Sequence, residues 1–295
     1  MGNGLLYLLL TVGMVSWGES WISAKVLTRF AEPEVLVFWR FFITWLTFIP
    51  VMFIMKKSFK INSKGLVAAI VGAVFLVLYN EMFFTGLIYG LAGAGGILVT
   101  TLIPLITFAL GCVFTLKSPT LRDSAGLILG FIGAAVIMEV WHINMHLLFK
   151  SGNAYFLIAA TTWALLTHTS KRANKYVSLY TFSFYLFMFT SVIIFVIIYA
   201  KGLTVAVPAN TMFVSNIMLI AVGATTYGTT IYFIATNVLG SQKASSFIFL
   251  VPLNALVMSY LFLGEAIKIN TVVGGLCAIT AVYLINHKKR VKQIA

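Results

Sequence analysis

The stretch "SWGESWISAK", residues 16–25, recurs in outline as "TWALLTHTSK", residues 162–171, and this recurrence decides the fold. The spacing from Trp17 to Lys25 equals the spacing from Trp163 to Lys171, and the two stretches are offset by 146 residues. Tryptophan and lysine are scarce in apolar helices, so their agreement at one spacing indicates that the chain contains a repeat.

Two further segments recur at nearly the same offset. "TLIPLITFAL" (101–110) lies over "FLVPLNALVM" (249–258), and "AGLILGFIGAAVI" (125–137) lies over "VGGLCAITAVYLI" (273–285). Both are offset by 148 residues. Nearly equal offsets over most of the chain predict a duplication, with units at residues 1–141 and 152–295.

The composition is that of an integral membrane protein. Of the 295 residues, 61% are hydrophobic and only 9% are charged, and the mean hydropathy is +1.02; soluble domains carry about 25% charged residues. Apolar runs of roughly 18 to 25 residues, long enough to cross a hydrocarbon layer of about 30 Å, follow one another along the chain. The ten expected spans are 5–24, 35–55, 66–89, 93–115, 123–140, 152–170, 178–199, 212–237, 244–263 and 269–286.

An odd number of helices per unit has a geometric consequence. If each unit has five helices, the second unit must cross the membrane in the opposite orientation to the first. We therefore predict an all-α integral membrane fold of ten transmembrane helices, built as a 5+5 inverted-topology repeat. Inverted repeats are a known architecture of secondary transporters, so transport is the leading functional interpretation.

The formal net charge of +13 is sorted by connection, which argues against nucleic-acid binding and favours a membrane surface. In the ten-helix frame, five basic residues lie on one side, and fourteen lie on the side that holds both termini. The positive-inside rule then places both termini in the cytoplasm, with the fourteen contacting anionic lipid headgroups. They are Lys56, Lys57, Lys60, Lys64, Lys117, Arg122, Lys171, Arg172, Lys175, Lys243, Lys288, Lys289, Arg290 and Lys292.

The sequence resembles the EamA family of the drug/metabolite transporter superfamily over essentially its whole length. The residues that carry the resemblance are Trp17 and Gly18 with Lys25 closing the first helix, Arg40 in "FWRFF", the helices of Pro104 and Pro252, and "LGE" at 263–265 followed by Gly274. The chain departs from the family pattern at Lys117, which stands where Glu265 stands in the second unit. The resemblance implies a 5+5 inverted repeat with cytoplasmic termini that moves small metabolites, without specifying which ones.

Three charged residues lie inside the predicted spans, away from their end residues: Glu19, Glu81 and Arg40. Charges at the bilayer centre cost roughly 2.5 to 3.5 kcal/mol each on insertion scales, so Glu19, Glu81 and Arg40 each need a reason. All three fall in the outer third of their helices, and we expect Arg40 to pair with Glu19 or to be shared with Glu81. One arginine cannot neutralise two carboxylates, so one carboxylate is free to carry a proton. A static ion pair and a group that binds substrate or a coupling proton both remain open.

Polar and aromatic side chains near the middle of the spans are the other candidates for a substrate site. Indole and phenol rings combine apolar area with a polar handle and can hold a cation, although ordinary packing explains any single aromatic residue equally well. The candidates are Trp17, Trp163, Tyr79, Asn80, Tyr227, Thr230 and Asn254. Pro104 and Pro252 are expected near mid-helix, as hinges or as fixed kinks.

Small residues form two helix faces. Gly126, Gly130 and Gly133 share one face, and Gly274, Gly275 and Ala278 share another. Such faces let helices approach closely. They pack the two repeats together or support a homodimer, and the sequence leaves both open, as it does the choice between monomer and dimer.

The sequence therefore favours a secondary transporter that works by alternating access on a small metabolite, such as an amino acid or an amine, with export as the direction and proton coupling as an option. No cofactor is expected, because the ATP-binding motif is absent. The histidines and cysteines show no metal spacing, and no catalytic motif supports an enzyme. An uncoupled channel or a membrane scaffold is the alternative.

Overall fold

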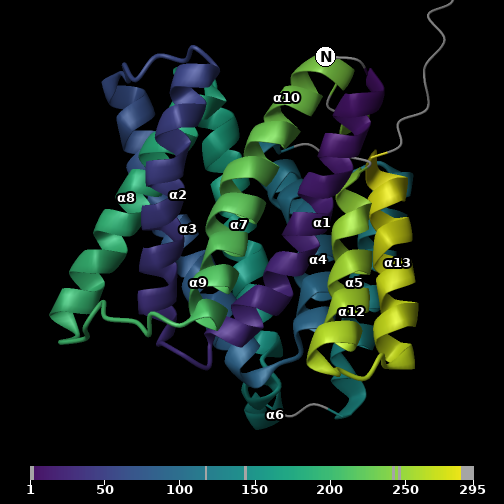
Figure 1. Ribbon diagram of the computed structural model, residues 1–295. Helices are drawn as coiled ribbons and strands as arrows, with labels where there is room; N and C mark the ends of the chain where they lie inside the picture. Colours follow the sequence, from purple (N-terminus) through teal and green to yellow (C-terminus); the bar gives the residue numbers. More distant parts are fainter. Residues whose placement is uncertain (1–2, 117, 143–144, 241–242, 245–246, 287–295) are drawn as a thin grey trace, which may run out of the picture.

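The computed structural model describes residues 3–116, 118–142, 145–240, 243–244 and 247–286, and all regular structure within these ranges is helical (Figure 1). The elements are α1 (Asn3–Leu27), α2 (Pro33–Ile54), α3 (Ser63–Tyr89), α4 (Ala92–Thr115), α5 (Leu121–Met138), η1 (Val140–His142), α6 (Met145–Lys150), α7 (Asn153–Ala173), α8 (Leu179–Ala200), α9 (Thr211–Met218), η2 (Leu219–Gly228), α10 (Thr229–Leu239), η3 (Phe247–Phe249), α12 (Leu250–Leu263) and α13 (Ile269–Asn286).

Polar caps set where several of these apolar helices begin. Asn62 accepts a hydrogen bond from the backbone N–H of Gly65 at the start of α3, and Asn210 accepts one from Phe213 at the start of α9. Thr120 and Asp123 form a reciprocal capping box before α5. Each cap satisfies an N–H group that has no partner inside the helix. The helix boundaries therefore follow from short polar segments between hydrophobic runs.

The lengths of the helices agree only in part with the ten predicted spans. Seven helices among the described residues are long and apolar enough to cross a membrane. Two further apolar stretches, Phe247–Leu263 and Ile269–Ile285, are shorter, and α7 is 21 residues long but is not among the seven. The all-helical, multi-span character is thus confirmed, whereas the count of ten crossings is not. Lys117 and the basic tail from residue 287 lie outside the described residues.

Helices α1 and α7, the first of each predicted unit, run in opposite directions. Lys25 near the end of α1 contacts Leu87 and Gly90 at the end of α3, so α1 and α3 run the same way. Gly86 near the end of α3 lies against Phe156 at the start of α7. Figure 1 shows the consequence: α1 descends from the N-terminus, and the chain enters α7 from the lower end, beside α6.

Each half of the chain packs mainly against the other half. α1 lies against η2 and α12, whereas α7 lies against α3 and α4. α5 packs on α13, and α2 packs on α8. These partners follow the predicted equivalence of the two halves, because the partners of α7 are the counterparts of the partners of α1. The duplication itself stays a prediction, but this exchange of partners is the pattern it would produce.

Helices α5 and α13, one from each half, approach each other closely at two glycines. A Cβ atom built on Gly133 would lie 2.6 Å from the carbonyl oxygen of Gly274, and one built on Gly274 would lie 2.5 Å from that of Gly133. Backbone cannot move away from such a clash as a flexible side chain can. Of the two roles left open for these glycines, the structure shows the contact between the halves.

We predict that Gly133→Ala destabilises the protein by about 1 to 3 kcal/mol, the usual penalty for overpacking. The measurement is the thermal unfolding midpoint of the purified protein in detergent. Gly223→Ala is the matched control, because a Cβ at Gly223 meets nothing within 4 Å. Equal midpoints for the two variants would contradict the close packing of α5 on α13.

Candidate functional site

Arg40 on α2 is the charged residue around which α2, α3 and η2 meet. Its Nη1 donates to the side-chain oxygen of Asn80 at 3.0 Å, and its Nε and Nη2 contact the hydroxyl of Thr225 at 3.4 and 3.3 Å. The guanidinium carbon lies 5.8 Å from the centre of the Phe83 ring. Arg40 therefore joins three helices from both halves through neutral oxygen acceptors and an aromatic face.

The predicted ion pair between Arg40 and Glu19 or Glu81 is wrong. The ion pairs among the described residues are Lys201 with Glu34 and Lys268 with Glu139. Glu19 instead accepts a hydrogen bond from Ser23 on its own helix. Glu81 follows Asn80 directly, and consecutive residues on a helix point in different directions. The amide of Asn80, rather than the Glu81 carboxylate, therefore reaches Arg40.

Trp17 is held by an irregular segment of the helix that faces it. Its indole Nε1 donates to the carbonyl of Ala224 at 2.7 Å. Ala224 lies in η2, a π-helical segment, where the N–H of Thr229 bonds to the carbonyls of Thr225 and Thr226. The carbonyl of Ala224 thus accepts the indole N–H within a segment of irregular helix geometry, which in a membrane is tolerated where it is buried in protein. Trp17 therefore ties α1 to η2.

The two threonines of η2 also link it to α2. The hydroxyls of Thr225 and Thr226 donate to carbonyls five residues earlier, at 2.8 and 3.0 Å. Thr226 bonds in addition to Thr47 on α2 at 2.7 Å. The prediction of a regular helix over 212–237 missed both the π-turns and Thr225 as the partner of Arg40. The cluster of polar residues in "TTYGTT", residues 225–230, was the feature of the sequence that could have indicated an irregular helix there.

Trp163 on α7 packs against α3. Its ring centre is 4.6 Å from that of Tyr79 in an edge arrangement, and Tyr79 stacks on Phe83 at 5.9 Å. Phe83 in turn contacts Trp21 at 4.7 Å. We call Tyr79, Phe83 and Trp163 the aromatic cluster. It adjoins Arg40 through Phe83, so the structure brings together four of the predicted residues: Arg40, Asn80, Tyr79 and Trp163.

The remaining polar candidates hold helices together. The hydroxyl of Tyr227 donates to the carbonyl of Leu9, and the amide of Asn254 donates to that of Val15, each at 2.8 Å. Both acceptors belong to α1. Thr230 bonds to the carbonyl of Thr226 on its own helix at 2.7 Å. The contacts of Tyr227 and Asn254 fix α1 between η2 and α12, and a role in substrate binding stays a prediction for all three residues.

The two predicted hinge prolines occupy different places. Pro104 lies inside α4, as expected. Pro252 lies in the first turn of α12, which begins at Leu250, so its expected position near mid-helix is wrong. A proline in the first turn removes no intrahelical hydrogen bond, because the first N–H groups have no partner there.

A cluster of polar contacts joins the halves at the lower end in Figure 1. The carboxylate of Glu265 accepts hydrogen bonds from the backbone N–H groups of Ala92 and Gly93, at 2.8 and 2.9 Å, and so caps α4. Lys25 donates to the carbonyls of Leu87 and Gly90 at the end of α3. Opposite charges at the two helix ends match the helix dipole. We call Glu265 and Lys25 with these partners the end clamp; sequence reasoning did not find it.

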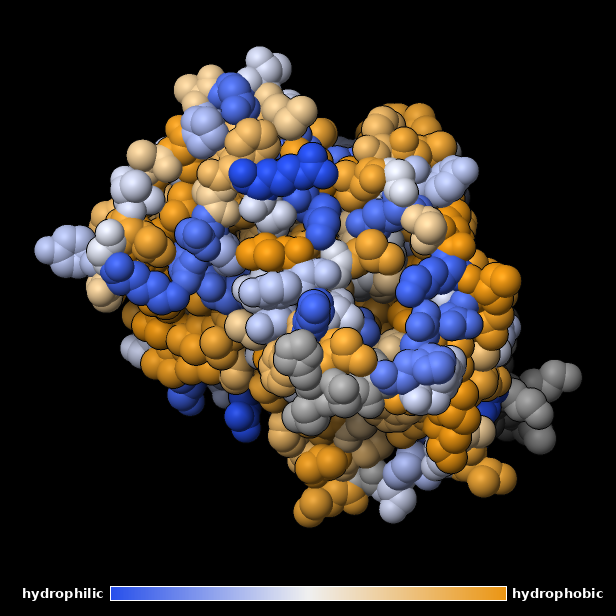
Figure 2. All heavy atoms as spheres, turned by 90° about the horizontal axis from the view of Figure 1, so that it is seen from below, coloured by the Kyte–Doolittle hydropathy of each residue, from blue (hydrophilic) through white to orange (hydrophobic). Residues whose placement is uncertain are grey.

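Further polar contacts lie at the same end, where Figure 2 shows hydrophilic side chains in several patches with hydrophobic side chains around the margin. Lys201 donates to Glu34, and this hydrogen bond raises the pKa of Lys201. Lys268 donates to Glu139 at 3.2 Å, and this bond lowers the pKa of Glu139. Both pairs join a residue of the first half to a residue of the second.

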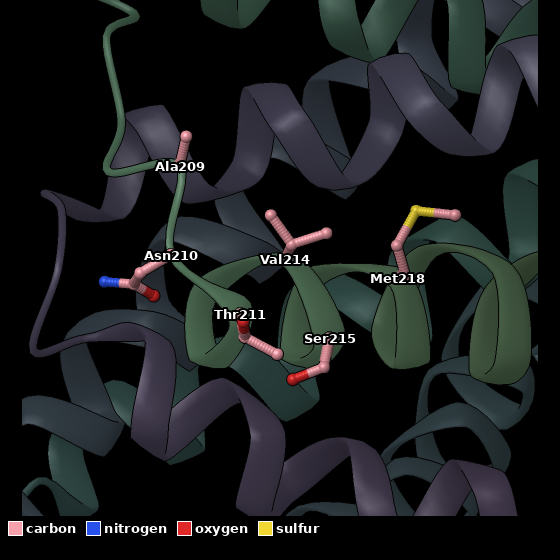
Figure 3. Close-up of a pocket in the computed structure, with 6 residues that line it drawn as sticks. All are labelled: Ala209, Asn210, Thr211, Val214, Ser215 and Met218. Atoms are coloured by element: carbon pink, nitrogen blue, oxygen red, sulfur yellow. The ribbon is translucent and has the colours of Figure 1, made fainter.

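Two hollows in the structure are not lined by Arg40. One, of about 330 Å³, is lined by residues at the start of α9, and Figure 3 shows Asn210, Thr211 and Ser215 there beside Val214 and Met218. The other, beside Pro104 and Val282, is an apolar gap without room for a water molecule. In the part of the chain that the structure describes, no three His, Cys, Asp or Glu residues come close enough to bind a metal.

Comparisons with known proteins agree with this architecture. The EamA-like transporter family matches the chain twice, over residues 4–139 and 150–287. The chain is 23% identical to the uncharacterized transporter YoaV of Bacillus subtilis, over 91% of this chain and 92% of the relative. It is 23% identical to the uncharacterized transporter YvbV of the same species, over 98% and 93%.

A relative from an archaeon also matches the chain over nearly its whole length. An uncharacterized transporter of Archaeoglobus fulgidus is 24% identical over 97% of this chain and 99% of the relative. One solved crystal structure superimposes with a TM-score of 0.64, at 16% identity over 95% of this chain and 96% of that one. At that identity the likeness concerns the fold alone.

The apolar helices and the family match together define a multi-pass membrane protein. The chain belongs to the EamA-like transporter family, since the two matches cover nearly its whole length. Its relatives are named as transporters, and not as enzymes.

We predict that Trp17→Phe destabilises the protein by about 1 to 3 kcal/mol, because the buried Ala224 carbonyl loses its side-chain donor. Trp163→Phe is the matched control: it makes the same change of side chain, and the indole N–H of Trp163 makes no hydrogen bond to the described residues. Thermal unfolding midpoints in detergent provide the measurement. A loss as large for Trp163→Phe would show that ring size, and not the hydrogen bond, matters at both sites.

Proposed function

We propose that the protein is a secondary transporter that exports a small amphiphilic metabolite, such as an amino acid or an amine, by alternating access. The energy would come from a gradient, and both termini would lie in the cytoplasm of a bacterial cell. The family match and the names of the relatives support the transporter class. The substrate and the direction of transport are parts of this proposal that the comparisons do not address.

The observation that carries the proposal is the meeting of polar and aromatic groups from both halves inside the helix bundle, away from the helix ends. Arg40 and Asn80 of the first half meet Thr225 of the second. Tyr79 of the first half meets Trp163 of the second. A site shared between two oppositely oriented halves can be opened to either side when one half moves against the other.

Glu81 is the carboxylate best suited to carry a coupling proton. Its Oε1 is buried and has no hydrogen-bond partner among the described residues, whereas Glu19 is engaged by Ser23. Glu34 and Lys201 act on Glu81 electrostatically from the lower end. An ionisable side chain at membrane depth without a fixed partner is a common element of proton-driven transport.

Transport is tested by flux into proteoliposomes that contain the purified protein, with amino acids and amines as labelled compounds. We expect saturable uptake and acceleration by unlabelled compound on the opposite side. Flux that rises linearly with concentration would indicate a channel instead, and no flux with any compound would indicate a scaffold. Liposomes without protein measure the leak.

Proton coupling is tested by comparing Glu81→Gln with Glu19→Gln. We expect Glu81→Gln to remove most of the pH dependence of flux, by at least about threefold, while the protein stays folded. Glu19→Gln makes the same chemical change on a carboxylate that already has a partner, and it should leave the pH profile in place. If Glu81→Gln lowers only abundance and thermal stability, Glu81 is structural.

Alternating access also requires the end clamp to open. Ser259 is 1% exposed, and its carbonyl accepts from the N–H of Glu265, so Ser259→Cys reports on opening there. In a background without Cys112 and Cys277, we expect Glu265→Gln to raise the rate at which a membrane-impermeant maleimide labels this cysteine several-fold, because the helix cap is weakened.

Glu139→Gln is the matched control for this experiment. It breaks the contact with Lys268 at the same end but leaves the end clamp intact. Equal labelling of the Ser259→Cys protein alone, with Glu265→Gln and with Glu139→Gln would show that Glu265 does not hold this end closed.

A further inference from the structure

Arg40 is a cation placed inside the helix bundle without an anion. It lies seven residues from the start of α2, a distance on the order of 10 Å along the helix. Its hydrogen-bond acceptors, Asn80 and Thr225, are both neutral. Charges at this depth normally pair with one another or with backbone carbonyls. The absence of a pair around Arg40 therefore needs an explanation.

Every acidic side chain of the chain can be checked, because all seven Asp and Glu residues lie within the described ranges. Glu34 and Glu139 pair with lysines. Glu265 and Asp123 cap helices. Glu19 bonds to Ser23, and Glu32 is exposed before α2. Glu81 has a buried oxygen without a partner among the described residues. None of the seven forms an ion pair with Arg40.

The guanidinium retains hydrogen-bonding capacity. It has five N–H groups in a planar fork, and its contacts with Asn80 and Thr225 use three of them. Two terminal N–H groups are therefore without an acceptor in the part of the chain that the structure describes. A planar fork matches the two oxygens of a carboxylate or of a phosphate.

Beside this fork lies apolar surface. Phe83 contacts the guanidinium, and the rest of the aromatic cluster, Tyr79 and Trp163, continues from it. Aromatic rings offer a large contact area for the apolar body of a ligand. The surroundings of Arg40 thus combine one unpaired cation with an aromatic wall.

We propose that Arg40 binds the anionic group of the transported compound, so that the substrate is a small organic anion with an apolar body. The aromatic cluster contacts that body. This inference rests on the proposed transport function and narrows it: an amino acid qualifies through its carboxylate, and a simple amine does not. The bound anion supplies the charge that the chain itself does not provide.

The test compares ligands that differ only in their charged group. The probes are 3-phenylpropionate, its neutral amide and 2-phenylethylamine, together with 4-methylpentanoate and its amide, added to the whole protein in phosphatidylcholine nanodiscs. Thermal shift detects binding, because a ligand of the folded state raises its stability. We expect both acids to bind and the amides and the amine to bind at least tenfold more weakly.

Variants assign the binding to Arg40. We expect Arg40→Gln to weaken acid binding at least tenfold, and Arg40→Lys to weaken it less, because the charge remains while the fork is lost. Lys171→Gln is the matched control: it removes one positive charge at an exposed position in the last turn of α7, and acid binding should not change. If Arg40→Gln does not fold, Arg40→Lys and the preference of the wild type for acids decide the question.

Two further measurements separate the sources of the anion. Inorganic phosphate tests a free phosphate, and nanodiscs with added phosphatidylglycerol test a lipid headgroup, which would compete with the acids. The proposal is overturned if no acid binds, if the amine binds better than the acid, or if Arg40→Gln binds the acids like the wild type. It is also overturned if phosphatidylglycerol alone displaces every acid.

Failure of this proposal is distinguishable from failure of transport. Saturable flux of an amine without any acid binding would preserve the transporter and exclude the role of Arg40. Acid binding that depends on Arg40, without flux in proteoliposomes, would preserve the anion site and exclude transport.

Discussion

The hydrogen bond from the Trp17 indole to the carbonyl of Ala224 is the contact on which the centre of the structure depends. Its acceptor lies in η2, a π-helical segment inside an apolar helix. Irregular helix geometry at membrane depth is tolerated where it is buried in protein. Trp17 packs on this segment, and their contact sets the position of α1 against the second half.

The rest of the centre follows from this position. With α1 held at η2, Tyr227 and Asn254 reach the carbonyls of Leu9 and Val15 and fix α1 between two helices of the second half. The same irregular segment presents Thr225 to Arg40 on α2. One local departure from α-helical geometry thus connects α1, α2 and η2, and it lies beside the aromatic cluster that joins α3 to α7. Because groups from both halves meet around Arg40 and the aromatic cluster, we propose the substrate site there.

Most acidic side chains at the helix ends are neutralised, whereas Arg40 at the centre is not. Most of the acidic side chains are used at the helix ends, where they bond to lysines or to free N–H groups. At those places solvent and helix dipoles reduce the cost of a charge. Arg40 is inside the bundle and has neutral partners only. The contrast between neutralised ends and an unpaired centre is what suggests a ligand that brings its own negative charge.

Much of the architecture could be predicted from the sequence, because hydropathy and repeat spacing are local properties. The apolar runs predicted a multi-span helical protein, and the resemblance to the family rested on Trp17 with Gly18, on Arg40 and on the helices of Pro104 and Pro252. Arg40, Asn80, Tyr79 and Trp163 were named as candidates by residue type and depth alone. The partners were not predictable: depth placed Arg40 beside Glu19 and Glu81, whereas the direction of each side chain around its helix selected Asn80. Only the tertiary structure decided that pairing, the π-turns of η2, the end clamp and the contact of Gly133 with Gly274, because each depends on how helices distant in sequence are rotated against one another.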